Sequence, residues 1–468
     1  MTFLPRTLLL ALAFLSLSLM LPAYLLCQED KLPAFNSVPE EGATSSEDGT
    51  LDDAGNLLVP DPQDLGLPQD TIIVDLPMEP EDPEGQVPTL PDPAPTTGPE
   101  WLEYCRLAPS TLLVKAIVDG GSDASYADED GFTTLMAAAS SNSDPAAISV
   151  LVANGADIKA KEKRFGFDAL KFAAAFNPHP LVVEVLLNQG ADPNELDNGG
   201  GTALTLAATM NFNPQIVASL LNAGCDINSK DAQGNTPLMG AAGYNKNFLV
   251  LAKLINDGAD VNSENELGNT PLFFAALSNP NPDILRELIK AGADPNHKNA
   301  RGETALFYAV QNPSLEVLKQ LLNAKADPLA KDETDTGILF AAALTSSNPL
   351  VLAELLTTGL DINALNSAGL SPLMAAAGNP HPEIARYLVV QGAKVDAVDD
   401  NGRSALLLAA WLNPEPKVIR TLLFAGGDPN IKDKEGNDLK AMAAKNLNPS
   451  SLVIVEHFLS LSQADTKS

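Results

Sequence analysis

Apolar residues recur along most of this chain in short runs that polar turns separate. Between Pro214 and Gly224, apolar side chains lie on one face of a helix: Ile216, Val217, Leu220 and Leu221. Pro214 suits the first turn of a helix because its φ is fixed, and Gly224 can end the helix in the left-handed conformation. The pattern predicts a short amphipathic helix.

A thinner helix, which is the first helix of the next unit, follows about a dozen residues later. Thr236 can cap its start and Pro237 can occupy its first turn. The alanine pair Ala241-Ala242 would let neighbouring helices approach closely. The polar residues 229–235 between the two helices predict a projecting, hairpin-like finger. Each unit is therefore a thin first helix, an amphipathic second helix and a finger.

This unit repeats with a period of about 34 residues. The turn that ends the amphipathic helix recurs at residues 190–194, 224–228, 258–262 and 292–296. Less regular copies begin near residues 121, 155, 326, 359, 392 and 426. A period of this length is typical of a solenoid, in which each unit buries its apolar face only against the next.

Two motifs at this spacing resemble the ankyrin repeat, over residues 101–468. They are Thr-Pro-Leu-x-x-Ala-Ala, as at Thr236, and Gly-Ala-Asp-x-Asn, as at Gly258. The resemblance implies an all-α ankyrin-repeat solenoid. We expect N-terminal capping helices in residues 101–130, the repeat array in 131–463 and a disordered tail in 464–468.

The link between the two helices of a repeat departs from the usual ankyrin pattern. An Asn-Pro pair replaces the usual Gly-His, and we expect Asn to end one helix while Pro opens the next. Linkers of this kind resemble those of exported bacterial ankyrin proteins. The pairs begin at Asn177, Asn213, Asn279, Asn312, Asn348, Asn379, Asn413 and Asn448.

The first 27 residues read as an export signal. Arg6 precedes an apolar run, residues 8–27, that contains no charged residue. The run is long enough to span a bilayer. The sequence leaves three outcomes open: an uncleaved membrane anchor, a cleaved signal peptide, or lipid attachment at Cys27. Each of them predicts a periplasmic or extracellular location for the rest of the chain.

Residues 28–100 predict a disordered, acidic, Pro-rich tether. They contain 18 Asp and Glu, 13 Pro and a single basic residue, Lys31. Like charges and frequent prolines oppose a packed core. The whole chain carries a formal charge of −31, which argues against binding to a phosphate backbone. We therefore expect no nucleic-acid partner.

No set of residues with catalytic or metal-binding spacing is found. The histidines His179, His297, His381 and His457 are scattered, and no Gly-rich phosphate loop or zinc motif occurs. The recurring aspartates, such as Asp226, are explained by turn formation. We expect no enzymatic activity and no cofactor.

Partner binding is expected on the concave face, because ankyrin arrays present the ends of their first helices and their fingertips there. At helix ends, the candidates are Phe176, Met210, Tyr244, Leu344, Trp411 and Leu412. Packing against neighbouring repeats is the alternative role for Phe176 and Met210. At fingertips, the candidates form a basic, aromatic tip and an acidic tip: Lys161, Lys163, Arg164 and Phe165, and Asp332 and Glu333.

The leading hypothesis is an exported, monomeric, non-catalytic module that holds a protein partner on this face. The alternative is a structural spacer or scaffold of the cell envelope, in which the array acts as a rod. The two hypotheses differ at Tyr244 and Trp411, because a spacer should tolerate substitutions there.

The weakest joint of the array is predicted near residues 325–336. Lys325 stands where other repeats have the capping Gly, and Gly-Ile follows Thr336 where Pro-Leu is usual. Counted to Thr336, this finger is one residue shorter than the finger before it. A repeat array opens first at its weakest interface.

Overall fold

The computed structural model describes residues 90–446 and 448–465, and Leu90–Ser468 forms one compact unit. The predicted export signal and most of the predicted acidic tether lie outside the described residues. Within the described part, helices follow one another in pairs, and no strand is present beyond isolated bridges such as Ala127 with Thr133. No described helix combines the length and apolarity that a membrane span requires.

The two helices of each pair belong to two series. The first helices are α2 (Pro99–Leu107), α4 (Thr134–Ser141), α6 (Ala169–Phe176), α8 (Ala203–Met210), α10 (Pro237–Tyr244), α12 (Pro271–Ser278), α14 (Ala305–Ala309), α16 (Ile338–Thr345), α18 (Pro372–Gly378), α20 (Ala405–Leu412) and α22 (Leu439–Ala444). The second helices are α3 (Ser110–Val118), α5 (Pro145–Ala153), α7 (Pro180–Asn188), α9 (Pro214–Asn222), α11 (Phe248–Asn256), α13 (Pro282–Lys290), α15 (Leu315–Asn323), α17 (Pro349–Thr357), α19 (Pro382–Val390), α21 (Pro416–Phe424) and α23 (Pro449–Asp465).

Capping residues set the ends of both helices, as the sequence predicts. The Thr236 hydroxyl accepts a hydrogen bond from the Met239 amide at 3.4 Å, which caps α10. In the preceding pair, the Asn213 side chain accepts from the Gln215 amide at 2.9 Å and caps α9. Gly224 follows α9 with φ 90°, a backbone conformation that favours glycine.

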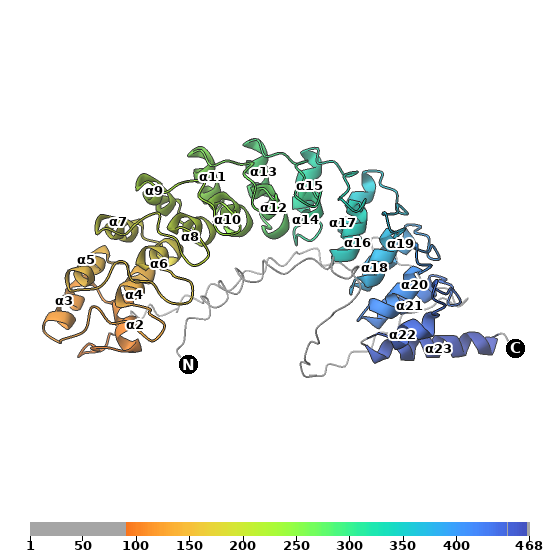
Figure 1. The fold of residues 1–468 in the computed structure, drawn as a ribbon, viewed down its shortest axis with the longest axis horizontal. Coiled ribbons are helices and arrows are strands. Elements are labelled where there is room, and N and C mark those ends of the chain that lie inside the picture. The colour runs from red at the N-terminus through yellow and green to blue at the C-terminus, as the bar shows by residue number, and fades with distance from the viewer. Residues whose placement is uncertain (1–89, 447, 466–468) are drawn as a thin grey trace, which may run out of the picture. The chain divides into compact units, whose positions relative to one another are not determined.

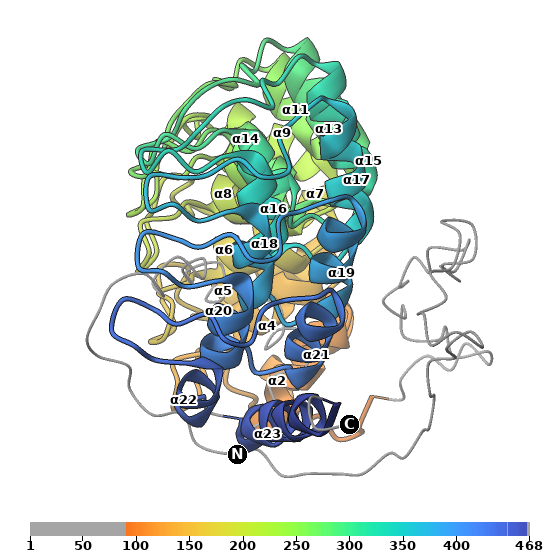
Figure 2. The ribbon, with the colours of Figure 1, turned by 90° about the vertical axis from the view of Figure 1, so that its right-hand side faces the viewer.

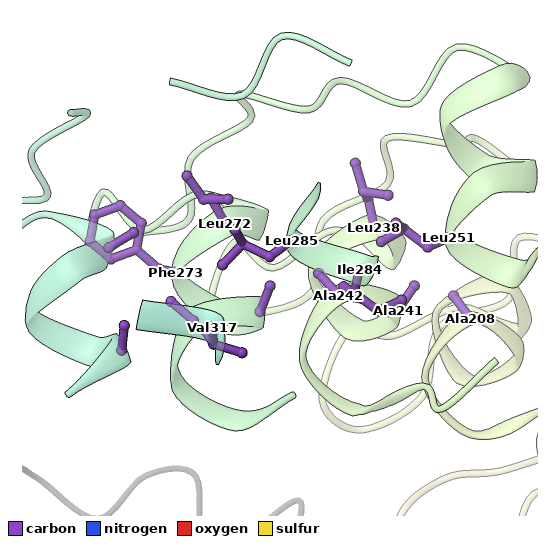
Figure 3. Packing of buried hydrophobic residues seen from close by; sticks show 14 of the residues in the cluster. Ala208, Leu238, Ala241, Ala242, Leu251, Leu272, Phe273, Ile284, Leu285 and Val317 are labelled. Atoms are coloured by element: carbon purple, nitrogen blue, oxygen red, sulfur yellow. The ribbon is translucent and has the colours of Figure 1, made fainter. Parts of the chain in front are cut away.

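The core is a continuous layer of aliphatic side chains between the two helix series. Figure 1 shows the first helices along the inner side of the stack and the second helices along its outer side. Ala241 and Ala242 of α10 are fully buried, as are Leu251 and Leu254 of α11. Figure 3 shows Ala241, Ala242 and Leu251 among the buried side chains of this layer. Each repeat therefore buries its apolar face against its neighbours.

The fingers form a third column beside the two helix series (Figure 2). In the finger before α10, the Asp231 carboxylate accepts hydrogen bonds from the Gln233 and Asn235 amides, at 2.9 and 2.8 Å. This finger also bonds to the one before it, since the Ala232 amide donates to the Gly199 carbonyl at 2.9 Å. The recurring turn aspartates thus shape the scaffold.

An asparagine follows each first helix from α4 to α22 except α16 and ties that repeat to the one before it; these side chains are buried, apart from the half-buried Asn446. Asn245 follows α10, and its side-chain amide donates to the carbonyls of Ala208 and Asn211, both at 2.8 Å. Its side-chain oxygen accepts from the Asn247 amide at 2.9 Å. We call these residues the linker ladder. Its members are Asn142, Asn177, Asn211, Asn245, Asn279, Asn312, Asn379, Asn413 and Asn446.

The ladder corrects the predicted role of the Asn-Pro pairs, because these pairs occupy two different positions. Asn177 and Asn379 are ladder residues at the end of a first helix. Asn213 and Asn348 instead cap the start of a second helix. A proline after either position satisfies the same local pattern, so the pairs alone did not distinguish a bond between repeats from a helix cap.

Both ends of the folded unit extend beyond the boundaries expected from sequence. Leu90 and Ala94 pack against the core, and the Ser122 hydroxyl donates to the Pro95 carbonyl at 2.9 Å. The segment that we assigned to the tether up to residue 100 therefore includes residues that contact the first repeat. At the other end, α23 continues to Asp465 and includes the first two residues of the expected tail.

The finger near residues 325–336 has the ordinary length, so that part of the weak-joint prediction is wrong. Gly337, one residue later than we assumed, is the N-cap of α16 and pairs with Lys331 as equivalent residues do in other fingers. The prediction for Lys325 agrees with the structure. Its φ is 64°, the left-handed conformation that glycine adopts in other repeats.

The linker ladder predicts that removing a single ladder side chain lowers the stability of the protein substantially. Asn245→Ala removes two hydrogen bonds to buried carbonyls, so we expect the free energy of unfolding to fall by about 2–4 kcal/mol. The matched control is Lys246→Ala, at the exposed next position, which should change it by at most about 0.5 kcal/mol. Urea unfolding followed by circular dichroism measures both. Equal effects of the two substitutions would contradict the ladder's role.

Candidate functional site

The helix-end candidates lie in one row on the inner side of the stack. Each lies one or two positions before a linker-ladder residue, except Leu344, which lies two positions before Ser346. Tyr244, the last residue of α10, is 36% exposed. The other candidates of the row are half buried and pack against the core: Phe176, Met210, Leu344, Trp411 and Leu412.

Phe176 belongs to an aromatic cluster that spans the first two repeats of the array. Phe172 lies at its centre, with ring centroids 5.1 Å from Phe132, 5.8 Å from Phe167 and 6.2 Å from Phe176. This arrangement agrees with the packing alternative for Phe176. Sequence analysis missed Phe132 and Phe172, although the four-residue step from Phe172 to Phe176 is a helical signal.

The basic fingertip is engaged by its neighbours. The Lys161 ammonium pairs with the Glu195 carboxylate and donates to the Leu196 carbonyl at 2.9 Å. On the other side, the Lys163 ammonium donates to the Glu129 carbonyl at 2.7 Å. The structure therefore gives both lysines a role in joining adjacent fingers.

Arg164 and Phe165 complete this fingertip. The Arg164 guanidinium lies 4.9 Å from the centroid of the Phe165 ring, a cation–π geometry. The buried Glu162 carboxylate accepts from the amides of both residues, at 2.7 and 2.8 Å, and holds the loop in place. The tip presents a fixed Arg-aromatic pair with acidic fingers on both sides.

The acidic fingertip divides into one scaffold residue and one exposed residue. The Asp332 carboxylate accepts from the Thr334 and Thr336 amides, at 2.8 and 2.9 Å, as turn aspartates do in other fingers. The Glu333 side chain is exposed. Of the two acidic candidates, Glu333 is the better placed to meet a partner.

Trp411 has a partner that sequence analysis missed. The Arg403 guanidinium lies 5.7 Å from its ring centroid, at the base of the adjacent finger. Arg403 is itself held by the buried Asp399 carboxylate, since both its Nε and its Nη2 lie 2.8 Å from Asp399 Oδ2. The signal available in the sequence was the finger turn, in which the aspartate accepts from the amide four residues later, as Asp399 does from Arg403. The indole of Trp411 therefore packs against the Arg403 guanidinium, and Asp399 sets the orientation of that guanidinium.

A polar cluster at the base of the finger before α14 was also missed. The Tyr308 hydroxyl donates to the Glu303 carboxylate at 2.9 Å and accepts from the Asn299 side chain at 3.1 Å. Its ring packs edge-on against Phe273, with centroids 5.3 Å apart. Burial, and after it the Glu303 charge, raises the pKa of Tyr308.

The remaining reactive groups of the described residues are potential metal ligands and thiols. No group of three or more potential metal ligands converges within them. Cys105 and Cys225 are buried free thiols, and burial raises the pKa of Cys225 to about 12. The Cys225 thiol therefore stays protonated near neutral pH and is a poor nucleophile.

A comparison with protein families agrees with the geometry. The family model described as "Ankyrin repeats (3 copies)" matches residues 105–197, 170–265, 238–332 and 339–433, which together exceed half of the chain. The expected all-α ankyrin-repeat solenoid is thereby confirmed. The resemblance to exported bacterial members stays a prediction.

One curated protein, human protein phosphatase 1 regulatory subunit 27, is similar over a short stretch. The two share 40% identity over 60 residues, which is 13% of this chain and 39% of that protein. Because the match covers less than half of either protein, it leaves the activity and the partners of this chain open.

The Tyr308 cluster predicts a pH dependence of stability. The folded-state pKa of Tyr308 is raised above the unfolded value of about 10, so its contribution is complete below pH 10 and is lost as pH rises further. At pH 8, Tyr308→Phe should lower the free energy of unfolding by about 1 kcal/mol, the worth of a hydrogen bond. By pH 11 this deficit should shrink. Urea titrations at both pH values test this, and an unchanged deficit would contradict it.

Proposed function

Because this chain belongs to the ankyrin-repeat family, we propose that it is a non-catalytic module that holds a protein partner on the inner face of its array. Ankyrin repeats indicate protein partners in general. The observation that carries the assignment to this face is Tyr244, a large aromatic side chain that ends α10 and is left 36% exposed. Aromatic residues of this kind are favoured anchors in protein interfaces.

The surroundings of Tyr244 support an interface centred on apolar contacts. The equivalent residues in the two preceding repeats are Met210 and Phe176, and both are half buried. A partner that covers Tyr244 would also remove the remaining exposed area of these neighbours from water. The row therefore offers a continuous apolar line with one exposed anchor.

Charge has a secondary role in this proposal. Lys161 and Lys163 already contact neighbouring fingers, and Asp332 is used within its own turn. Exposed ion pairs contribute about 0–1 kcal/mol and are screened by salt. We expect Glu333 and Arg164 to influence the rate and orientation of association more than its strength.

The short similarity to a phosphatase regulatory subunit fits a role without catalysis. We propose in addition that the module acts outside the cytosol as a monomer, exported by residues 1–27 and, in one of the three outcomes, anchored to a membrane by residues 8–27. The support is the charge-free apolar run after Arg6.

The inner-face proposal predicts which aromatic residues matter for binding. Tyr244→Ala should weaken partner binding at least tenfold, the effect of losing a hot spot of about 1.4 kcal/mol or more. Trp411→Ala should also weaken it, with a larger loss of stability because this side chain is half buried. The matched control is Phe424→Ala at the end of the outer helix α21, where the ring is 69% exposed.

The partner can be identified by crosslinking at the same two positions, 244 and 424, and its affinity can then be measured. A photo-crosslinking amino acid at position 244, introduced into the full chain in its native cells, captures the partner for identification by mass spectrometry. Position 424 serves as the control. Binding of the purified partner is then measured by calorimetry. If Phe424→Ala weakens binding and Tyr244→Ala does not, the outer face is the binding surface; if neither does, the spacer hypothesis is favoured.

Export is tested by fusing residues 1–100 to alkaline phosphatase, which is active only after export. We expect activity from this fusion and at least a tenfold loss when residues 8–27 are deleted, since the apolar run is the targeting element. Comparable activity of the deleted fusion would contradict the export proposal. Fluorescence of a cytosolic reporter fused at the same position provides the converse control.

A further inference from the structure

Three sets of hydrogen bonds join neighbouring repeats, and one joint of the array lacks two of them. The first set is the linker ladder. The second, which we call the turn ladder, runs from α9 onward and uses an Asn or Asp in the turn after a second helix; Asn262, for example, accepts from the Asp294 amide at 3.2 Å. The third, the finger ladder, joins the backbones of adjacent fingertips. The exceptional joint lies between the pair α14–α15 and the pair α16–α17.

The linker ladder is interrupted at this joint by Ser346. Asn312 and Asn379, the ladder residues on either side, each donate two bonds to the preceding repeat. Ser346 stands at the equivalent position after α16. Its shorter hydroxyl bonds only within its own turn, to the Asn348 carbonyl at 3.3 Å and from the Asn348 amide at 3.1 Å.

The turn ladder is interrupted at the same joint by Leu329. In the preceding repeat, Asn296 accepts from the Asp327 amide at 2.7 Å, and in the following repeat, Asn363 accepts from the Lys394 amide at 2.9 Å. Leu329 occupies the equivalent position, is 70% exposed, and has no polar atom that could accept a bond from the next turn.

The finger ladder continues across the joint. The Glu333 amide donates to the Arg301 carbonyl at 3.0 Å, a distance found at other fingers. On the outer side, α15 and α17 share one ion pair, in which Lys319 Nζ lies 4.0 Å from Glu354 Oε2 with both side chains partly exposed. Such a pair contributes little. The hydrogen bonds across the joint are therefore concentrated at its fingers, and elsewhere it is held by the apolar core that continues from α15 to α16.

The backbone of the same repeat is under local strain. Among the described residues, Lys325 and Asp335 are the non-glycine residues with positive φ, at 64° and 63°. Their equivalents in the preceding repeat are Gly292 and Gly302. A non-glycine residue in this region costs about 1 kcal/mol or more. Gly337 also lacks the side-chain oxygen that Thr, Ser or Asp carries at the N-cap of the other first helices from α4 to α22.

We propose that the array consists of two blocks, residues 90–323 and 338–465, joined by a hinge at residues 325–336 that pivots on the fingers. Two of three bond sets are missing at one interface, and the retained set defines the pivot. This inference goes beyond the proposed function. Tyr244 lies in the first block and Trp411 in the second, so the hinge angle sets the spacing of the two anchors, and a partner that contacts both fixes that angle.

Distance distributions between spin labels test the hinge directly. One pair, at Lys290 and Arg386, spans the hinge; the control pair, at Asn188 and Lys290, lies within the first block, and all three positions are exposed. The labels attach to cysteines introduced into a Cys27→Ser chain, in which the two remaining native cysteines, Cys105 and Cys225, are buried. We expect the distribution across the hinge to be at least twice as wide as the control.

A repaired variant provides the decisive comparison. Ser346→Asn with Leu329→Asn restores a side chain able to make each missing set of bonds, and should at least halve the width of the distribution across the hinge while leaving the control pair unchanged. Urea unfolding should change in parallel, from two transitions in the parent to one, or to two with closer midpoints, in the repaired chain.

The reverse variant keeps the test independent of the repair. Asn245→Ser, placed within the first block, should widen the distribution between positions 188 and 290, since it recreates the Ser346 defect at an intact joint. Equal widths for both label pairs in the parent protein would overturn the hinge. So would a repaired variant whose width and transitions match those of the parent while Asn245→Ser has no effect.

Discussion

The stack depends on satisfying the backbone carbonyls that lie buried between repeats. Each first helix ends with carbonyls that lack helical partners, and the next repeat covers them and excludes water. Asn245 supplies both of its amide hydrogens to two such carbonyls, and its oxygen holds its own linker. An asparagine side chain is suited to this task because it offers two donors and an acceptor on a short stem. The interaction therefore fixes at once the end of a helix, the path of the linker and the contact between repeats.

This constraint also determines which positions are available for function. The residue before a ladder asparagine ends the first helix on the inner side, where neither the ladder nor the alanine layer specifies it. Tyr244 occupies such a position before Asn245, and Leu412 does so before Asn413. The scaffold can keep its bonds while these side chains vary, so the inner row can be adapted to a partner without loss of the fold. At Ser346 the ladder residue itself is replaced, and the ladder bonds between two repeats are lost.

The fold was predictable from the sequence because its signals are local and repeated. Thr236, Pro237 and Gly224 each fix a backbone conformation within a few residues, and the period of the copies places the units side by side. The site was less predictable, because it depends on contacts between residues one repeat apart. The roles of Lys161 and Lys163 required knowing which carbonyls the neighbouring fingers present. The two positions of the Asn-Pro pairs became clear only from their side-chain hydrogen bonds. The one-residue shift at Gly337 became clear from the start of α16 and from the bridge between Gly337 and Lys331.

The central claim is that the side chains of the ladder asparagines stay hydrogen-bonded to the preceding repeat. Hydrogen exchange of their side-chain amides measures how often these bonds open. In the protein with ¹⁵N-labelled asparagine, we expect the Nδ2 protons of residues such as Asn211 and Asn245 to exchange as slowly as backbone amides of the adjacent helices. Exposed asparagines such as Asn154 supply the rapidly exchanging reference. If the ladder side chains exchange as rapidly as Asn154, their bonds open freely in solution and the repeats are held together by apolar packing alone.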